Sequence, residues 1–242
     1  MAVKDEVFKE AIPQSSDFKF DNKVVTVFDD MVTRSVPFYL EIQRMIGELA
    51  SEYAKPGTFV YDLGCSTGTT MMNMNATVHS SVGFKGLDDS TEMLDKCREN
   101  LKTFGMTRDF ELINADLNKK VTIADASVAV LCLTLQFIRP LYRVQLLEHV
   151  RKGLVEGGCV ILVEKILAEE PGLNRNYIKY YYDFKKRNQY SEMEIAQKRE
   201  ALENVLVPYK LSEDLEMLTT SGFSHSEVFF KWYNFAGIIA FK

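Results

Sequence analysis

Hydrophobic and polar positions alternate along the chain in blocks of two kinds. Short runs of apolar, β-favouring residues predict strands, and segments whose apolar residues recur every three or four positions predict helices. The predicted strands cover residues 58–63, 82–87, 110–114, 128–133, 159–163, 223–230 and 233–241. Helices are predicted between most of them, at about 68–77, 90–101, 141–154 and 212–220, the last capped by Ser212. This alternation predicts a Rossmann-like α/β fold, with a mostly parallel seven-stranded sheet and helices on both faces.

Two segments depart from the alternation. Residues 1–57 predict an N-terminal helical arm, with one helix from a cap at Asp21 to Asp30 and a longer one capped by Ser35. We expect the apolar residues before it to pack on the body; they are Phe8, Ile12, Phe18 and Phe20. Residues 166–210 predict a helical insertion or cap before the last two strands, with a capping box from Ser191 to Glu194 and a helix to Val205. The chain 1–242 is therefore expected to form a single α/β domain.

Tyrosines and basic residues are interleaved within 166–210. Such interleaving is found on nucleic-acid faces, and it is equally found on a helical cap whose tyrosines line a pocket or an interface. The net charge of −5 and the pI near 5.4 favour the cap and give no reason to expect direct binding of nucleic acid.

The composition of the chain indicates its expected cellular compartment. The chain has no run of eighteen apolar residues, and its first residues lack the apolar core of a signal peptide, so we expect a cytoplasmic protein without a membrane segment. The four cysteines and three histidines are widely spaced, so we expect reduced thiols and no metal site.

A glycine-rich turn follows the first predicted strand, in the stretch Phe59-Val60-Tyr61-Asp62-Leu63-Gly64-Cys65-Ser66-Thr67-Gly68. A strand, a turn of this kind and a helix form a cradle for a nucleotide cofactor. Asp62 would repel a pyrophosphate but suits an ammonium group, which favours S-adenosylmethionine (SAM). We expect Gly64, Cys65 and Ser66 to line the cofactor; the alternative is a tight turn without a ligand.

Further polar residues lie at the ends of the other strands, where parallel sheets bind ligands. Asp88 is the candidate for the ribose hydroxyls, with Asp89 as its competitor. Asp116 and Leu117 are candidates for the adenine, and Cys132 ends the fourth strand. Tyr39 precedes the sheet and could present its ring to the sulfonium, although its spacing alone suits a core residue.

Several further motifs resemble the carboxy-S-adenosylmethionine synthase family, within the class I SAM-dependent methyltransferase fold, over nearly the full length. They include Arg34-Ser35-Val36-Pro37 with Tyr39, the glycine turn, Thr134-Leu135-Gln136-Phe137, Asp183-Phe184-Lys185, Tyr190-Ser191-Glu192, Gln197-Lys198-Arg199 and Leu202-Glu203-Asn204-Val205. The sequence departs from the family at Cys132, where asparagine is usual.

The resemblance implies an unusual reaction. Such enzymes convert SAM and prephenate to carboxy-SAM, phenylpyruvate and water, and carboxy-SAM then serves a tRNA carboxymethyltransferase that modifies wobble uridine. By the family pattern, Tyr39 and Arg199 are the catalytic residues that hold the new carboxylate, with Arg199 contributed by the other subunit of a homodimer. On sequence alone, Arg199 would equally be a solvated helix arginine.

Two alternatives stay open at this point. One is a conventional SAM-dependent methyltransferase that acts on a small molecule or RNA. The other is a non-catalytic SAM-binding subunit that delivers or senses the cofactor.

Overall fold

The computed structural model describes residues 4–10, 18 and 20–242. The predicted parallel sheet is present. Its seven main strands are ordered β3-β2-β1-β4-β5-β8-β7, and a two-residue strand, β6, pairs with β5. The strands are β1 Phe59–Leu63, β2 Gly83–Asp88, β3 Phe110–Asn114, β4 Ala126–Cys132, β5 Leu154–Leu167, β6 Tyr209–Lys210, β7 His225–Trp232 and β8 Phe235–Phe241. β8 pairs antiparallel with both β5 and β7, and the other strand pairs are parallel.

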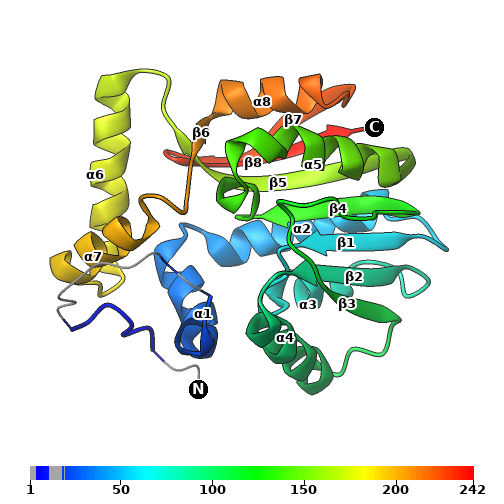
Figure 1. The fold of residues 1–242 in the computed structure, drawn as a ribbon, viewed down its shortest axis with the longest axis horizontal. Helices are drawn as coiled ribbons and strands as arrows, with labels where there is room; N and C mark the ends of the chain where they lie inside the picture. Colours follow the sequence, from blue (N-terminus) through cyan, green and yellow to red (C-terminus); the bar gives the residue numbers. More distant parts are fainter. Residues whose placement is uncertain (1–3, 11–17, 19) are drawn as a thin grey trace.

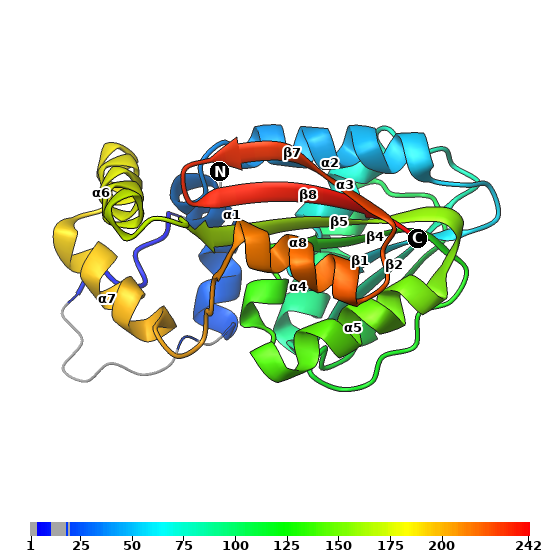
Figure 2. The same cartoon turned by 90° about the horizontal axis from the view of Figure 1, so that it is seen from above.

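Helices cover both faces of the sheet, as predicted. On one face lie α2 (Tyr39–Tyr53), α3 (Thr69–Asn75) and α4 (Thr91–Phe104), and on the other lie α5 (Pro140–Gly153) and α8 (Leu211–Thr220) (Figure 2). Residues alternate along β4, so Val128 and Val130 pack on the first face, whereas Ala129 and Leu131 pack on the second. The apolar run of β4 is thus explained by burial on both faces.

The helical insertion stands beyond the carboxyl ends of the strands. It consists of α6 (Pro171–Arg187) and α7 (Glu192–Leu202), which lie beside α1 (Asn22–Ser35) at the left of Figure 1. The capping box between Ser191 and Glu194 is present at the start of α7. The helix ends at Leu202 and not at Val205 as predicted.

The N-terminal arm packs against this insertion. Phe8 is buried, and Phe18 and Phe20 pack on a cluster formed by α1 and Met93, as expected. The Phe18 amide donates to the carbonyl of Ala201 in α7 at 2.9 Å. Ile12 lies outside the described residues.

Two predicted helix caps are wrong. Ser35 is the last residue of α1, and α2 is preceded instead by Phe38 in a left-handed conformation (φ 56°). Ser212 lies inside α8, where its hydroxyl donates to Glu169. In both cases the hydroxyl has a tertiary partner that local spacing does not reveal, since the Ser35 hydroxyl accepts from Lys198.

The fifth strand is longer than predicted. The segment Glu156-Gly157-Gly158, which we expected to close a helix, lies within β5, where Gly157 adopts φ +66°. The register therefore shifts between the Leu154 and Cys159 pairings with β4. This longer strand carries Lys165 to the same end of the sheet as the glycine turn. None of the helices in the described part of the chain is long and apolar enough to cross a membrane.

Candidate functional site

A cavity of about 930 Å³ lies at the carboxyl ends of the strands and is closed by α1, α6 and α7. Its volume suits a ligand of the size of a nucleoside derivative together with a second small molecule. Nine of the eleven residues predicted to bind the cofactor line it. They are Tyr39, Gly64, Cys65, Ser66, Asp88, Asp89, Leu117, Cys132 and Arg199. Asp62 and Asp116 are not among the lining residues.

The glycine turn is fixed from two sides. The amides of Gly64 and Cys65 both donate to the Leu87 carbonyl, at 2.7 and 3.0 Å. The Thr67 hydroxyl donates to Asp29 in α1 at 2.7 Å. Since neighbouring β2 and α1 both hold the turn, it is preorganised before any ligand arrives.

Asp62 is the most deeply buried carboxylate of the turn region. Its side chain is in β1 and is 1% exposed, and its Oδ2 atom has no hydrogen-bond partner within the described residues. Burial, with the negative charge of Asp88, raises the pKa of Asp62 to about 7. An unpartnered buried carboxylate oxygen next to the cavity fits the ammonium group predicted there from sequence.

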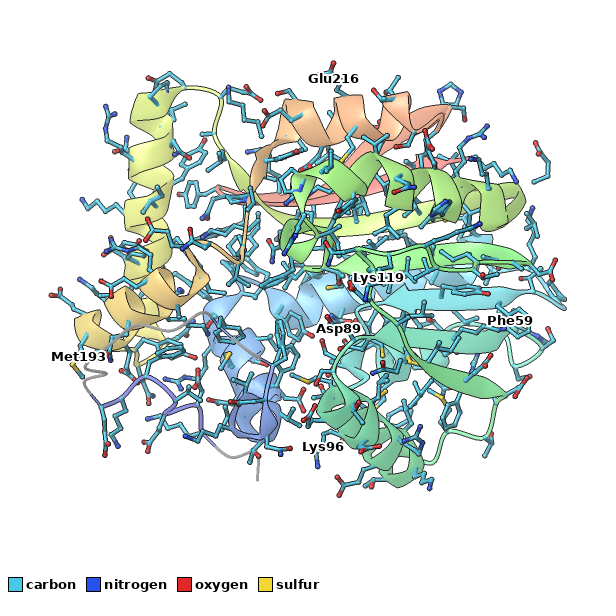
Figure 3. The ribbon with its side chains drawn as sticks, in the orientation of Figure 1. Phe59, Asp89, Lys96, Lys119, Met193 and Glu216 are labelled. Atoms are coloured by element: carbon cyan, nitrogen blue, oxygen red, sulfur yellow. The ribbon has the colours of Figure 1, made fainter. Side chains whose placement is uncertain are left out.

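The two candidate residues for the ribose hydroxyls, Asp88 and Asp89, differ in their burial and in their hydrogen bonds. Asp88 accepts from the amides of Ser66 (2.9 Å) and Ser90 (3.0 Å), so its carboxylate braces the glycine turn. Asp89 is exposed, lines the cavity and lies at the end of the sheet that faces the insertion, away from the labelled Phe59 (Figure 3). Burial raises the pKa of both carboxyls.

The two residues predicted to bind the adenine, Asp116 and Leu117, face in different directions. Asp116 turns to its own loop, where Oδ1 accepts from the amide and side chain of Asn118 and Oδ2 lies 3.3 Å from Lys119 Nζ. Leu117 and Asn118 face the cavity instead.

Tyr39 and Cys132 form the floor near the middle of the sheet. Tyr39 begins α2 and is 7% exposed, and burial raises its pKa well above the ordinary value. The Cys132 thiol accepts from Gln43 Nε2 at 3.5 Å, and burial also raises its pKa. Both are therefore neutral at physiological pH and suit the apolar and cationic parts of a sulfonium ligand.

Arg199 and Lys198 are adjacent in α7 but lie differently. Arg199 is exposed at the rim of the cavity of its own chain. Lys198 is 7% exposed, donates to the Ser35 hydroxyl at 3.1 Å and lies 3.9 Å from Asp5.

Sequence reasoning missed a group of cavity residues contributed by β5, α6 and α7. Lys165, Tyr181, Lys185 and Lys198 all line the cavity. Two signals could have found them. Lys165 lies two residues after the apolar run of the fifth strand, and Tyr181 and Lys185 are one helical turn apart.

The described part of the chain holds no group of three or more histidine, cysteine or acidic side chains that could bind a metal ion. The cavity offers a preorganised glycine turn, carboxylates at strand ends and cationic side chains on the cap. It is equipped to bind a cationic nucleoside and an anionic partner at one place.

Comparison with known proteins first defines the class. Residues 60–158 match the family model described as "Methyltransferase domain". An O-methyltransferase family protein from Burkholderia thailandensis superposes with a TM-score of 0.68 at 14% identity, covering 92% of this chain and 60% of that one. A SAM-dependent methyltransferase from Aquifex aeolicus gives 0.61 at 16% identity, covering 92% and 99%. The chain thus has the class I fold of SAM-dependent methyltransferases, although it spans only about three fifths of the first of these structures.

Full-length relatives then define the family. A carboxy-S-adenosyl-L-methionine synthase from Methylococcus capsulatus is 54% identical over 240 residues, covering 99% of each chain. Another, from Sulfurimonas denitrificans, is 43% identical and covers 99% of this chain and 100% of its own. The chain belongs to the carboxy-S-adenosyl-L-methionine synthase family.

Proposed function

We propose that this protein converts SAM and prephenate to carboxy-SAM, phenylpyruvate and water. The observation that carries the proposal is the full-length identity of 54% to a relative of that name, which includes the insertion that closes the cavity. The reaction balances: the SAM methyl group loses a proton and gains the carbon dioxide lost from prephenate, and the departing hydroxide of prephenate takes the proton.

The cavity supports a division of roles within the SAM site. The glycine turn (Gly64, Cys65, Ser66) would cradle the methionine part, and the free Oδ2 of Asp62 would accept from its ammonium group. We propose Asp89 for the ribose hydroxyls, because the Asp88 carboxylate already accepts from two amides. The backbone of Leu117, next to Asp116, would meet the adenine, and Cys132 would contact the methionine part from the floor. Bound SAM supplies a methyl group that the sulfonium activates.

Arg199 and Tyr39 are proposed to hold the new carboxylate. A guanidinium binds a carboxylate through two parallel charge-assisted hydrogen bonds, and a hydroxyl can add a third. We propose further that the protein is a homodimer in the cytoplasm and that Arg199 serves the site of the neighbouring subunit, which its exposure on α7 allows. The user of carboxy-SAM would be a tRNA carboxymethyltransferase, with no direct tRNA binding by this chain.

Mass spectrometry of the reaction tests the proposed activity. The purified protein is incubated with SAM, with and without prephenate, and we expect a SAM-derived product heavier by one carboxylate only when prephenate is present. Absence of that product at saturating prephenate would refute the proposal. Methyl transfer to an added acceptor would then favour a conventional methyltransferase, and retention of SAM without turnover would favour a non-catalytic subunit.

Arg199 variants test the carboxylate site. Arg199→Ala should lose affinity for carboxy-SAM in preference to SAM, and Arg199→Lys should recover only part of it, because an ammonium cannot form the double bond of the fork. Arg187→Ala, at the exposed end of α6, is the matched control and should leave both affinities unchanged. Equal loss of SAM and carboxy-SAM in Arg199→Ala would contradict the assignment.

A further inference from the structure

A buried lysine, Lys185, and a half-buried one, Lys165, both lie over one aromatic ring on the wall of the cavity. Lys165 comes from the end of β5 and Lys185 from α6, and both line the cavity. Their ammonium nitrogens lie 5.2 and 4.4 Å from the ring centroid of Tyr181. Lys185 and Tyr181 are 6% and 7% exposed. The sheet and the cap thus bring two cations to one place that neither element forms alone.

Neither ammonium group has a hydrogen-bond or ion-pair partner among the described residues, apart from the face of the Tyr181 ring. Lys198, the third lysine of this wall, differs because it has Ser35 and Asp5. Burial, with the charges of Lys198 and Lys165, holds the pKa of Lys185 well below the ordinary value, and the charge of Asp5 opposes this only in part. Burial also lowers the pKa of Lys165.

Buried ammonium groups without an anion are costly to the folded protein. Buried lysines are rare unless they are paired, so the buried Lys185 with the half-buried Lys165 beside it in the cavity wall indicates a place for an anionic ligand group. A ligand carboxylate would supply the missing counter-charge and restore the protonated form of both lysines. A lysine ammonium group is a compact point charge, so two lysines can each contact the same carboxylate.

We propose that Lys165 and Lys185 bind the carboxylate of the second substrate that is not transferred. This inference rests on the proposed function, in which prephenate brings two carboxylates. One becomes part of carboxy-SAM at Arg199 and Tyr39, and the other stays on the arylpyruvate product. The lysine pair, on β5 and α6 of the same chain, is a cationic position distinct from Arg199, which is proposed to reach the site from the neighbouring subunit. Binding of the two prephenate carboxylates at two different cationic positions would orient prephenate with its departing carboxylate toward SAM.

Phenylpyruvate is the probe, because it carries only the retained carboxylate. Its affinity for the SAM-saturated protein is measured by calorimetry in the wild type, Lys165→Met, Lys185→Met and the double variant. We expect about tenfold weaker binding for each single variant, from the loss of one charge-assisted contact, and a larger loss for the double variant. SAM affinity should stay within about twofold of wild type. The control is Lys179→Met, an exposed lysine of the same helix, which should bind both ligands normally.

Turnover and stability provide the second measurement. The KM for prephenate should rise in Lys185→Met, whereas the affinity for carboxy-SAM, a ligand without the retained carboxylate, should stay unchanged. The melting temperature of Lys185→Met should rise, because methionine fills the space without a buried charge. A variant with a raised melting temperature has folded, so a loss of phenylpyruvate binding in it cannot be ascribed to unfolding.

The outcomes separate this inference from the proposed function. Unchanged phenylpyruvate affinity and unchanged KM in the double variant would overturn the lysine site, even if carboxy-SAM is formed. A fall in SAM affinity equal to that of phenylpyruvate would also overturn it, because the lysines would then serve the methionine carboxylate. If the wild type makes no carboxy-SAM but binds phenylpyruvate through the lysines, the proposed function fails and the anion site stands.

Discussion

Gly64 and Thr134 lie so close that no side-chain carbon fits between them. A Cβ placed on Gly64 would be 2.5 Å from both Cγ2 and Oγ1 of Thr134. Thr134 lies two residues after the end of β4, and Gly64 directly follows β1, its neighbour in the sheet. The glycine of the cofactor turn is therefore required by the packing of two adjacent strand ends, in addition to any approach of a ligand.

Gly64→Ala should destabilise the protein by about 2–4 kcal/mol, since φ +82° costs an alanine about 1 kcal/mol and the overlap with Thr134 costs the rest. Gly57→Ala is the matched control, with φ +76° and nothing within 4 Å of the added carbon, so it reports the backbone cost alone. Adding Thr134→Ala to Gly64→Ala should restore part of the loss. Urea denaturation measures all four proteins, and equal losses for Gly64→Ala and Gly57→Ala would contradict the steric account.

Asp62→Asn should make the ligand-free protein more stable in a pH-dependent way. The folded pKa of about 7 lies above the ordinary value of 3.8, so the wild type loses stability as pH rises between these values. The advantage of the variant should grow from pH 4 to pH 8, by up to about 4 kcal/mol. Its affinity for SAM should fall, because the amide is a weaker partner for an ammonium group. A stability difference that does not change with pH would refute the assignment of the raised pKa to Asp62.

Lys198→Met should remove a rise in stability at alkaline pH. Burial lowers the pKa of Lys198 from 10.5 to about 8, and the charged groups that act on it are Asp5, Arg34 and Asp30. Between about pH 8 and 10.5 the unfolded chain binds the proton that the folded protein has lost, so Lys198 adds up to about 3 kcal/mol to wild-type stability as pH rises. The wild type minus variant difference in unfolding free energy should show this slope. Parallel pH profiles would contradict it.

Tyr190→Phe should loosen the N-terminal arm from the insertion. The Tyr190 hydroxyl donates to Asp5 Oδ2 at 2.6 Å, and Asp5 is 2% exposed. Loss of this donor leaves a buried carboxylate less well satisfied, at a cost of about 1–3 kcal/mol. Hydrogen exchange should show faster exchange of the Val7 amide, which donates to Asp5. Tyr180→Phe, on an exposed tyrosine, should stay within about 0.5 kcal/mol of wild type; matching losses in both variants would count against the role of Asp5.

Local patterns predicted most of the scaffold. The strand Phe110–Asn114 has its expected limits, and β4 is buried on both faces as its apolar run indicated. The sequence also predicted a ligand site at the strand ends, and one cavity brings together Tyr39, Gly64 and Arg199 from distant segments. Errors arose where a side chain had a distant partner. Ser35 and Ser212 are good helix caps by spacing, but Lys198 and Glu169 engage their hydroxyls.

The amino-acid order alone determined the alternation of strands and helices, because burial of one helix stripe and of whole parallel strands leaves a periodic signal in the chain. It also determined the kinds of groups at the strand ends. Tertiary structure alone decided which lysines of the cap turn inward. The sequence spaces Lys179, Lys185 and Lys198 among tyrosines without distinction, and only the docking of α6 and α7 on β5 and α1 buries two of the three. Burial changes the charge chemistry of a lysine, and burial by a distant segment leaves no local pattern.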